Sequence, residues 1–134
     1  MTSTLLYAPA DYWLLSDAAR AEICDGCGPN FLAEFIPDKL LGLDISDACD
    51  IHDYMYAVGR SEEDRHIADR VFLNNMLRII NHDSKEVLKP ARRIMALTYY
   101  YIVRSFGAPW FWGGKNLPEE MNAPADIFGP EFDN

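Results

Sequence analysis

The fold is decided by two stretches of the sequence, ACDIHDYMY at residues 48–56 and ADRVFL at residues 68–73. Apolar residues recur at three- and four-residue steps in and around both, which is the spacing of an amphipathic helix. The first stripe consists of Ile45, Ala48, Cys49, Met55 and Tyr56, and the second of Phe72, Leu73, Met76, Leu77 and Ile80. His52 falls within the first stripe, and Asp69 lies one turn before the second. We therefore predict two helices, each with a titratable side chain on its apolar face.

His52 and Asp69 are predicted to pair with each other. A buried carboxylate without a partner is costly, so an inward-facing Asp69 needs a donor. The predicted turn, GRSE at residues 59–62, is centred as many residues after His52 as before Asp69. Two helices that fold back antiparallel, with a rise of about 1.5 Å per residue, bring both side chains to the same height. The sequence therefore predicts an antiparallel helix pair that carries a His/Asp site.

The remaining segments also favour a mostly α fold. A first helix is expected over residues 9–23, followed by a turn-rich loop at 24–30 and an irregular apolar run to residue 43. Asp44 or Ser46 suits the cap of the second helix, which should run to about residue 58, and SEED at residues 61–64 resembles a capping box that opens the third. The third helix should end near residue 81.

In a fourth stretch from residue 83, Pro90 should kink the helix or delay its regular part. Gly107 and Pro109 should stop it, leaving a tail that is largely loop and packed on the body by its aromatic residues.

The composition restricts the possible partners. The 134 residues suffice for one domain, residues 1–134, with a real core. A net charge of −9 argues against nucleic acid, which requires clustered Lys and Arg. The densest basic group, Lys85, Lys89, Arg92 and Arg93, fits one solvated helix face. We expect no transmembrane segment and see no secretory signal, so the protein should be cytoplasmic or leave by a non-classical route.

The cysteines admit a metal site. Three is an odd number, which excludes full disulfide pairing within one chain. Cys24-x-x-Cys27 and Cys49-x-x-His52 supply three thiols and an imidazole in two pairs, as a structural zinc site requires. Residues three apart on a helix share a face, so Cys49 and His52 are able to chelate together. One open interpretation is therefore a non-enzymatic module that binds Zn²⁺, with Asp69 orienting His52.

The same residues resemble an enzyme family. Ala48-Cys49-x-x-His52-Asp53-x-x-Tyr56, followed by Ala68-Asp69 with Phe72-Leu73, resembles the active-site helix pair of phospholipase A2, with the microbial members closest. Upstream, DGCGPN at residues 25–30 resembles the calcium loop of that family. The resemblance covers roughly residues 24–76. It implies calcium-dependent hydrolysis of a phospholipid acyl ester, with a membrane surface as one source of substrate.

The roles that the resemblance implies agree with the chemistry of the side chains. His52 would be the general base that activates water, and Asp69 would accept from its other ring nitrogen. Tyr56, one turn beyond His52, would donate to Asp69. Asp53 lies about 100° around the helix from His52, so it is free to face the loop and offer carboxylate oxygens to Ca²⁺.

The implied calcium site also draws on the loop. Its ligands there would be the backbone carbonyls of Gly26, Gly28 and Asn30, with the Gly28 amide as a further donor to the oxyanion. The sequence departs from the family at Met55, where a cysteine is usual, and at Asn30, where the secreted animal enzymes have glycine. Cys27 and Cys49 match a disulfide of the family. A third interpretation is a catalytically inactive relative that holds an acyl chain or a partner protein.

Overall fold

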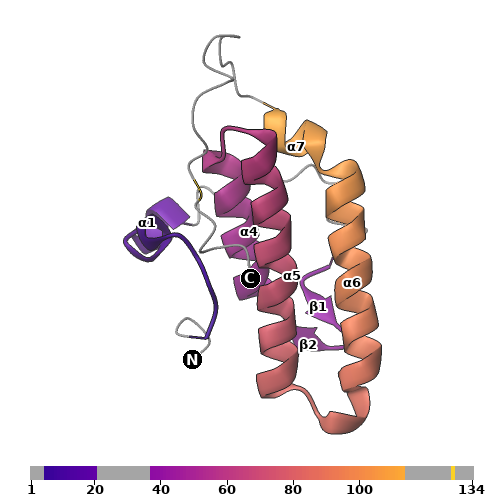
Figure 1. Cartoon of the computed structure of the whole chain (residues 1–134). Helices are drawn as coiled ribbons and strands as arrows, with labels where there is room; N and C mark the ends of the chain where they lie inside the picture. The colour runs from indigo at the N-terminus through magenta and orange to yellow at the C-terminus, as the bar shows by residue number, and fades with distance from the viewer. Residues whose placement is uncertain (1–4, 21–36, 114–127, 129–134) are drawn as a thin grey trace.

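Three long helices form the body of the protein (Figure 1). The computed structural model describes residues 5–20, 37–113 and 128. Within these residues helices predominate, so the predicted mostly α fold is confirmed. Helix α5 lies between α4 and α6 and contacts both, and each helix runs antiparallel to the one before it.

The predicted helix pair is α4, Ser46–Val58, and α5, Glu62–Asp83. The N-cap residue of α4 is Ile45, without a side-chain cap, and not Asp44 or Ser46 as predicted. Asp44 Oδ1 accepts the backbone N–H of Ser46, the first residue of the helix, at 2.8 Å. Helix α5 begins at the predicted cap, since the Ser61 hydroxyl accepts the backbone N–H of Asp64 at 3.0 Å. It ends two residues beyond the predicted boundary. A turn of only a few residues separates the two helices, which makes them antiparallel neighbours.

The fourth helical stretch starts as a short 3₁₀ turn, η1, Glu86–Leu88, and continues as α6, Lys89–Phe106. Pro90 lies in the first turn of α6, where its missing N–H costs nothing, so it delays the regular helix as predicted. The expectation that Arg92 lies on a solvated face is wrong. Arg92 is buried, and its guanidinium donates to the carbonyls of Leu40 and Leu41 at 2.8 and 2.7 Å.

Those two carbonyls belong to a small β-hairpin that the sequence reading missed. Strand β1, Lys39–Leu40, pairs antiparallel with β2, Leu43–Asp44. Leu41 and Gly42 both have positive φ, 49° and 86°, which is the two-residue turn that suits a twisted hairpin. Strands of two residues are too short to show an alternation of apolar and polar side chains. The sequence therefore predicts only an irregular run to residue 43 in this part of the chain.

Two further expectations are corrected at the ends of the described chain. The helix predicted over residues 9–23 is interrupted: α1, Ala10–Trp13, ends early, and Ser16 accepts the N–H of Ala19 at the start of a new turn at residues 17–20. The tail predicted as loop from residue 107 begins with a short helix, α7, Ala108–Trp112. Pro109 stops α6 but suits the first turn of α7.

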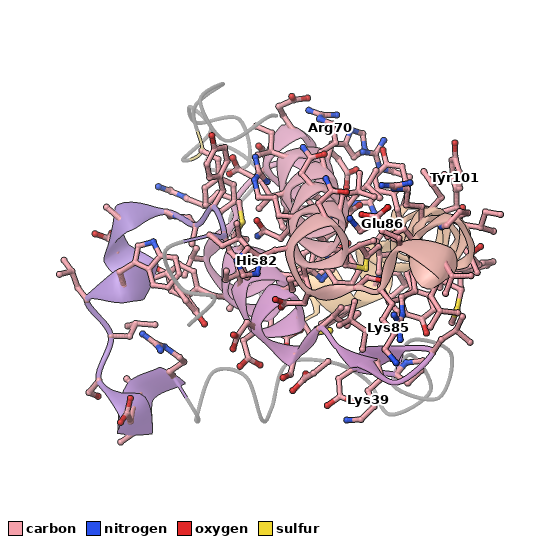
Figure 2. All side chains as sticks on the ribbon, turned by 90° about the horizontal axis from the view of Figure 1, so that it is seen from below. Lys39, Arg70, His82, Lys85, Glu86 and Tyr101 are labelled. Carbon is pink, nitrogen blue, oxygen red and sulfur yellow. The ribbon has the colours of Figure 1, made fainter. Side chains whose placement is uncertain are left out.

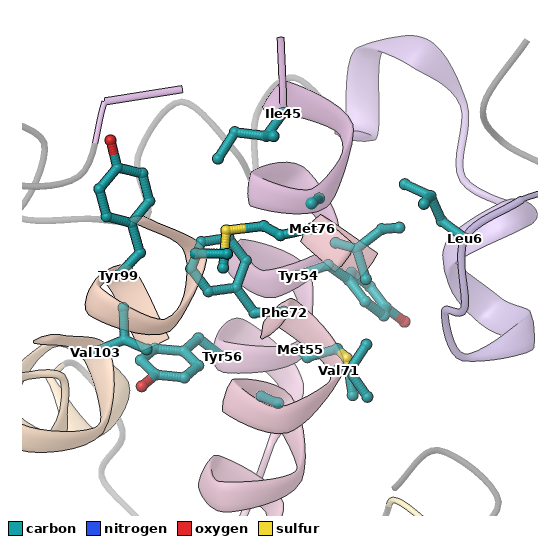
Figure 3. Packing of buried hydrophobic residues seen from close by; sticks show 14 of the residues in the cluster. Leu6, Ile45, Tyr54, Met55, Tyr56, Val71, Phe72, Met76, Tyr99 and Val103 are labelled. Atoms are coloured by element: carbon teal, nitrogen blue, oxygen red, sulfur yellow. The ribbon is translucent and has the colours of Figure 1, made fainter. Parts of the chain in front are cut away.

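The core fills the space between the three long helices (Figure 3). Phe72 and Met76 of α5 lie at its centre, with Tyr99 and Val103 of α6 on one side. Charged and polar groups such as Arg70 and Lys39 project outward (Figure 2). Within the described residues no helix combines the length and the apolar character needed to cross a bilayer.

Candidate active site

His52 and Asp69 meet in the core between α4 and α5. The His52 Nε2 and Asp69 Oδ1 atoms are 2.9 Å apart, and the two residues expose 2% and 0% of their surfaces. The pairing predicted from the position of the turn is thus confirmed, whereas the catalytic roles of the two residues stay predictions. Because the carboxylate accepts at Nε2, it favours the tautomer that carries its proton there and leaves the lone pair on Nδ1. Among the described residues, no hydrogen bond to Nδ1 is formed.

Tyr56 donates to the same carboxylate oxygen. Its hydroxyl lies 2.7 Å from Asp69 Oδ1, the partner that the resemblance implies for Tyr56. Burial, followed by the negative charge of Asp69 and the hydrogen bond to it, raises the pKa of Tyr56. The hydroxyl therefore stays protonated and acts as a donor. Gly107 lies directly beside this hydroxyl, and a Cβ there would collide with it.

Two arginines on the other oxygen of Asp69 were missed by the sequence reading. Arg104 Nε donates to Asp69 Oδ2 at 3.3 Å, and Arg65 Nη1 lies 3.7 Å from the same atom. The i,i+4 spacing of Arg65 and Asp69 on α5 was a usable signal. Arg104 comes from α6, 35 residues further along the chain, and no local pattern points to it.

Aromatic rings enclose His52. Phe72 stacks on the imidazole with centroids 4.6 Å apart, and Trp110 of α7 meets it edge-on at 5.5 Å. Trp110 also contacts the Tyr56 ring, at 4.8 Å. The expectation that the tail aromatics pack on the body is confirmed for residues 110–112. Their packing also keeps bulk water away from the His/Asp pair.

Asp53 lies next to His52 in sequence but on another side of α4. It is half-buried, and burial, with a smaller contribution from the charge of Asp50, raises the pKa of its carboxyl to about 8. A nearby cation would favour its ionised form. The role of Asp53 as a calcium ligand stays a prediction.

The rest of the predicted metal ligands lie outside the described residues: Gly26, Gly28 and Asn30 of the calcium loop, and Cys24 and Cys27 of the zinc alternative. Cys49 is a free thiol, and burial, followed by the charge of Asp53, raises the pKa of that thiol. Across residues 5–20, 37–113 and 128, no three His, Cys, Asp or Glu side chains gather as a metal site.

The arrangement is a buried imidazole whose one nitrogen is held by a carboxylate, with a phenol and two guanidiniums as the other partners of that carboxylate. Such a pair is suited to removing a proton from a small nucleophile that reaches the opposite nitrogen. No protein-family model, curated protein or solved structure matches this chain.

Proposed function

We propose that this protein is a calcium-dependent lipid esterase of the phospholipase A2 type. The observation that supports the proposal is the shared carboxylate oxygen, Asp69 Oδ1, which lies 2.9 Å from His52 Nε2 and 2.7 Å from the Tyr56 hydroxyl. A buried polar pair that only fixed helix register would not account for the adjacent Asp53 and the predicted calcium loop at residues 25–30. The resemblance of residues 48–56 and 68–73 to the family's active-site helices assigns these residues the same roles.

In the proposed reaction, His52 Nδ1 takes a proton from water while the water oxygen bonds to the ester carbonyl carbon. The tetrahedral species then breaks the bond to the alcohol oxygen, which receives the proton from His52, and the products are a fatty acid and a lysophospholipid. Asp69 keeps its charge and stabilises the imidazolium between these two steps. Tyr56 holds Asp69 in place.

Calcium would polarise the ester carbonyl and stabilise the oxyanion when bound. Asp53 is the described residue that would hold it, together with the predicted carbonyls of Gly26, Gly28 and Asn30. The raised pKa of Asp53 fits this role, because burial and Asp50 disfavour its charge until a cation compensates. Asp53 supplies carboxylate oxygens, which Ca²⁺ prefers.

Access to His52 requires movement of the aromatic shell. His52 exposes 2% of its surface, and Trp110 covers it from the side of α7. Trp110 and Phe72, the rings that contact His52, are apolar, so an acyl chain would meet apolar side chains once the aromatic shell has moved.

The test is hydrolysis of phosphatidylcholine vesicles with calcium or with a chelator, comparing wild type with His52→Gln. We expect activity with calcium only, and a loss of about 10²- to 10⁴-fold in the variant. His82→Gln is the matched control, since His82 is exposed at the end of α5 and contacts Asp83. Equal rates in wild type and His52→Gln, both folded by circular dichroism, contradict the mechanism.

Elemental analysis of the dialysed protein distinguishes the zinc alternative. About one zinc per chain would assign His52 to a structural site with Cys24, Cys27 and Cys49. The His52–Asp69 contact fits both interpretations, because Asp69 would orient His52 in a zinc site too. Burial, followed by the charge of Asp53, raises the pKa of Cys49, which disfavours the thiolate that zinc would require. Lipid that copurifies without turnover would indicate the inactive binding relative instead.

A further inference from the structure

The two oxygens of the Asp69 carboxylate have different partners. Oδ1 accepts from His52 and Tyr56, both on α4, whereas Oδ2 faces two guanidiniums, Arg104 on α6 and Arg65 on α5. Asp69 has no exposed surface, so water does not replace a lost partner. The orientation of this carboxylate is therefore set by donors from three helices.

Arg104 is itself fixed in place. Its Nε donates to Asp69 Oδ2 at 3.3 Å, and its Nη2 donates to the backbone carbonyl of His66 at 3.3 Å. Its guanidinium also lies over the Tyr100 ring, 5.2 Å from the centroid. These contacts use the planar fork of arginine, because one guanidinium reaches both a side chain and a backbone group of α5.

Arg65 is the weaker partner of Asp69. Its Nη1 is 3.7 Å from Oδ2, too far for a good hydrogen bond, and it donates to the Arg104 carbonyl at 3.2 Å. Its Nε donates to Glu62 Oε1 at 3.2 Å. Of the two cations, Arg104 makes the only direct hydrogen bond to Oδ2 within the described residues.

We propose that Arg104 is a positioning residue that holds the Asp69 carboxylate so that Oδ1 faces His52 and fixes the imidazole proton on Nε2. Among the described residues Arg104 has no hydrogen bond or ring contact with His52, so it would act through Asp69. Without it, Oδ2 is a buried charged oxygen with only a distant guanidinium, which is unfavourable. The carboxylate is then expected to turn toward Arg65, which takes Oδ1 away from His52.

The direct readout is the tautomer of His52, from nitrogen-15 and proton NMR of histidine-labelled protein. We expect wild type to carry the Nε2–H tautomer with a downfield proton from the bond to Asp69. Arg104→Met and Arg104→Gln remove the cation and should lose that downfield signal and mix the two tautomers. Arg104→Lys restores the charge and should recover the wild-type spectrum in part.

Arg70→Met is the matched control. Arg70 lies on α5 beside Asp69 in sequence, but its side chain points outward to Glu63 at 3.3 Å. We expect it to leave the His52 signals unchanged. A wild-type tautomer and downfield proton in both Arg104→Met and Arg104→Gln overturn the proposal. An equal loss of the downfield His52 signal in Arg70→Met would also overturn the proposal, because it would reveal a general loss of stability.

The consequence for catalysis rests on the proposed function. If that function holds, Arg104→Met should lower kcat by about 10- to 100-fold with KM nearly unchanged, as removal of an orienting outer partner does elsewhere. The two proposals fail separately. A wild-type protein without lipase activity leaves the NMR result intact, whereas an unchanged tautomer in an active Arg104→Met refutes the positioning role only.

Discussion

Asp69 is the residue on which the site depends. It has no exposed surface, and it gathers one imidazole, one phenol and two guanidiniums. Burial of a carboxylate is expensive unless such donors compensate it, and removal of one donor leaves part of that cost uncompensated. Removal of a single donor to this carboxylate should therefore lower the free energy of unfolding measurably.

Tyr56→Phe removes one of these donors while keeping the ring. We expect a loss of about 1–2 kcal/mol in the free energy of unfolding, because Asp69 Oδ1 keeps only its bond to His52. Tyr54→Phe is the matched control, since Tyr54 is also buried on α4 but has no hydrogen bond from its hydroxyl within the described residues. Urea denaturation of both variants tests the difference, and equal losses contradict the role given to Tyr56.

Asp53 makes stability depend on pH. Its folded pKa is raised to about 8, by burial and then by Asp50, whereas the unfolded carboxyl titrates at about 4. Between these values the folded state binds more protons than the unfolded state, so this contribution to stability falls as pH rises.

The pH effect is measured by urea denaturation in a chelator. Each pKa unit corresponds to about 1.4 kcal/mol, so wild type should lose more stability between about pH 5 and about pH 8.5 than Asp53→Asn does. Added calcium should offset the loss in wild type, since a cation favours the ionised carboxylate. The same pH dependence in both proteins would contradict this account of Asp53.

At the scale of the element, α5 organises the molecule. It supplies Asp69 and Arg65 to the site and Phe72 and Met76 to the core, and it contacts both α4 and α6. Its start sets its register against α4, because few residues separate the two helices. A well-defined start of α5 therefore places Asp69 opposite His52.

Ser61→Ala removes the side-chain cap of α5. The Ser61 hydroxyl satisfies the N–H of Asp64 at 3.0 Å, and its loss should cost about 1 kcal/mol of stability. Ser105→Ala, at an exposed position of α6, should have almost no effect or a small gain from helix propensity. Thermal denaturation compares the two, and a cost at Ser105 equal to that at Ser61 excludes a capping effect.

At the scale of the whole molecule, α7 closes the site. Phe111 is buried against Tyr56 with centroids 5.2 Å apart, and Trp112 Nε1 donates to Glu62 at 2.7 Å. These contacts attach the end of α6 to the turn between α4 and α5 (Figure 1). They also bring Trp110 onto His52.

Phe111→Ala should cost about 3–5 kcal/mol, the usual effect of deleting a buried phenylalanine. Phe106→Ala is the matched control, because Phe106 is 61% exposed only five positions earlier and should cost little. The release of α7 should also expose Trp110, which is read as a red shift of tryptophan fluorescence in Phe111→Ala. Wild-type stability in that variant would refute the anchoring role of Phe111.

Much of the helical arrangement was predictable because local patterns are strong in this chain. The apolar spacing of residues 45–56 and 72–80, the Ser61 cap and Pro90 each act within a few residues, and they determine where α4, α5 and α6 begin. The β-hairpin at Leu41–Gly42 and helix α7 were missed, since elements of two to five residues carry too little pattern to be recognised.

The sequence by itself determined the antiparallel helix pair and the meeting of His52 with Asp69, because a short turn and a constant helical rise fix the relative height of two side chains. Only the tertiary structure decided which groups complete the site. Arg104 reaches Asp69 from 35 residues away, and Trp110 reaches His52 from the helix beyond it. Such contacts depend on how α6 and α7 fold back over α4 and α5. That arrangement follows from the packing of the whole core, and no local periodicity predicts it.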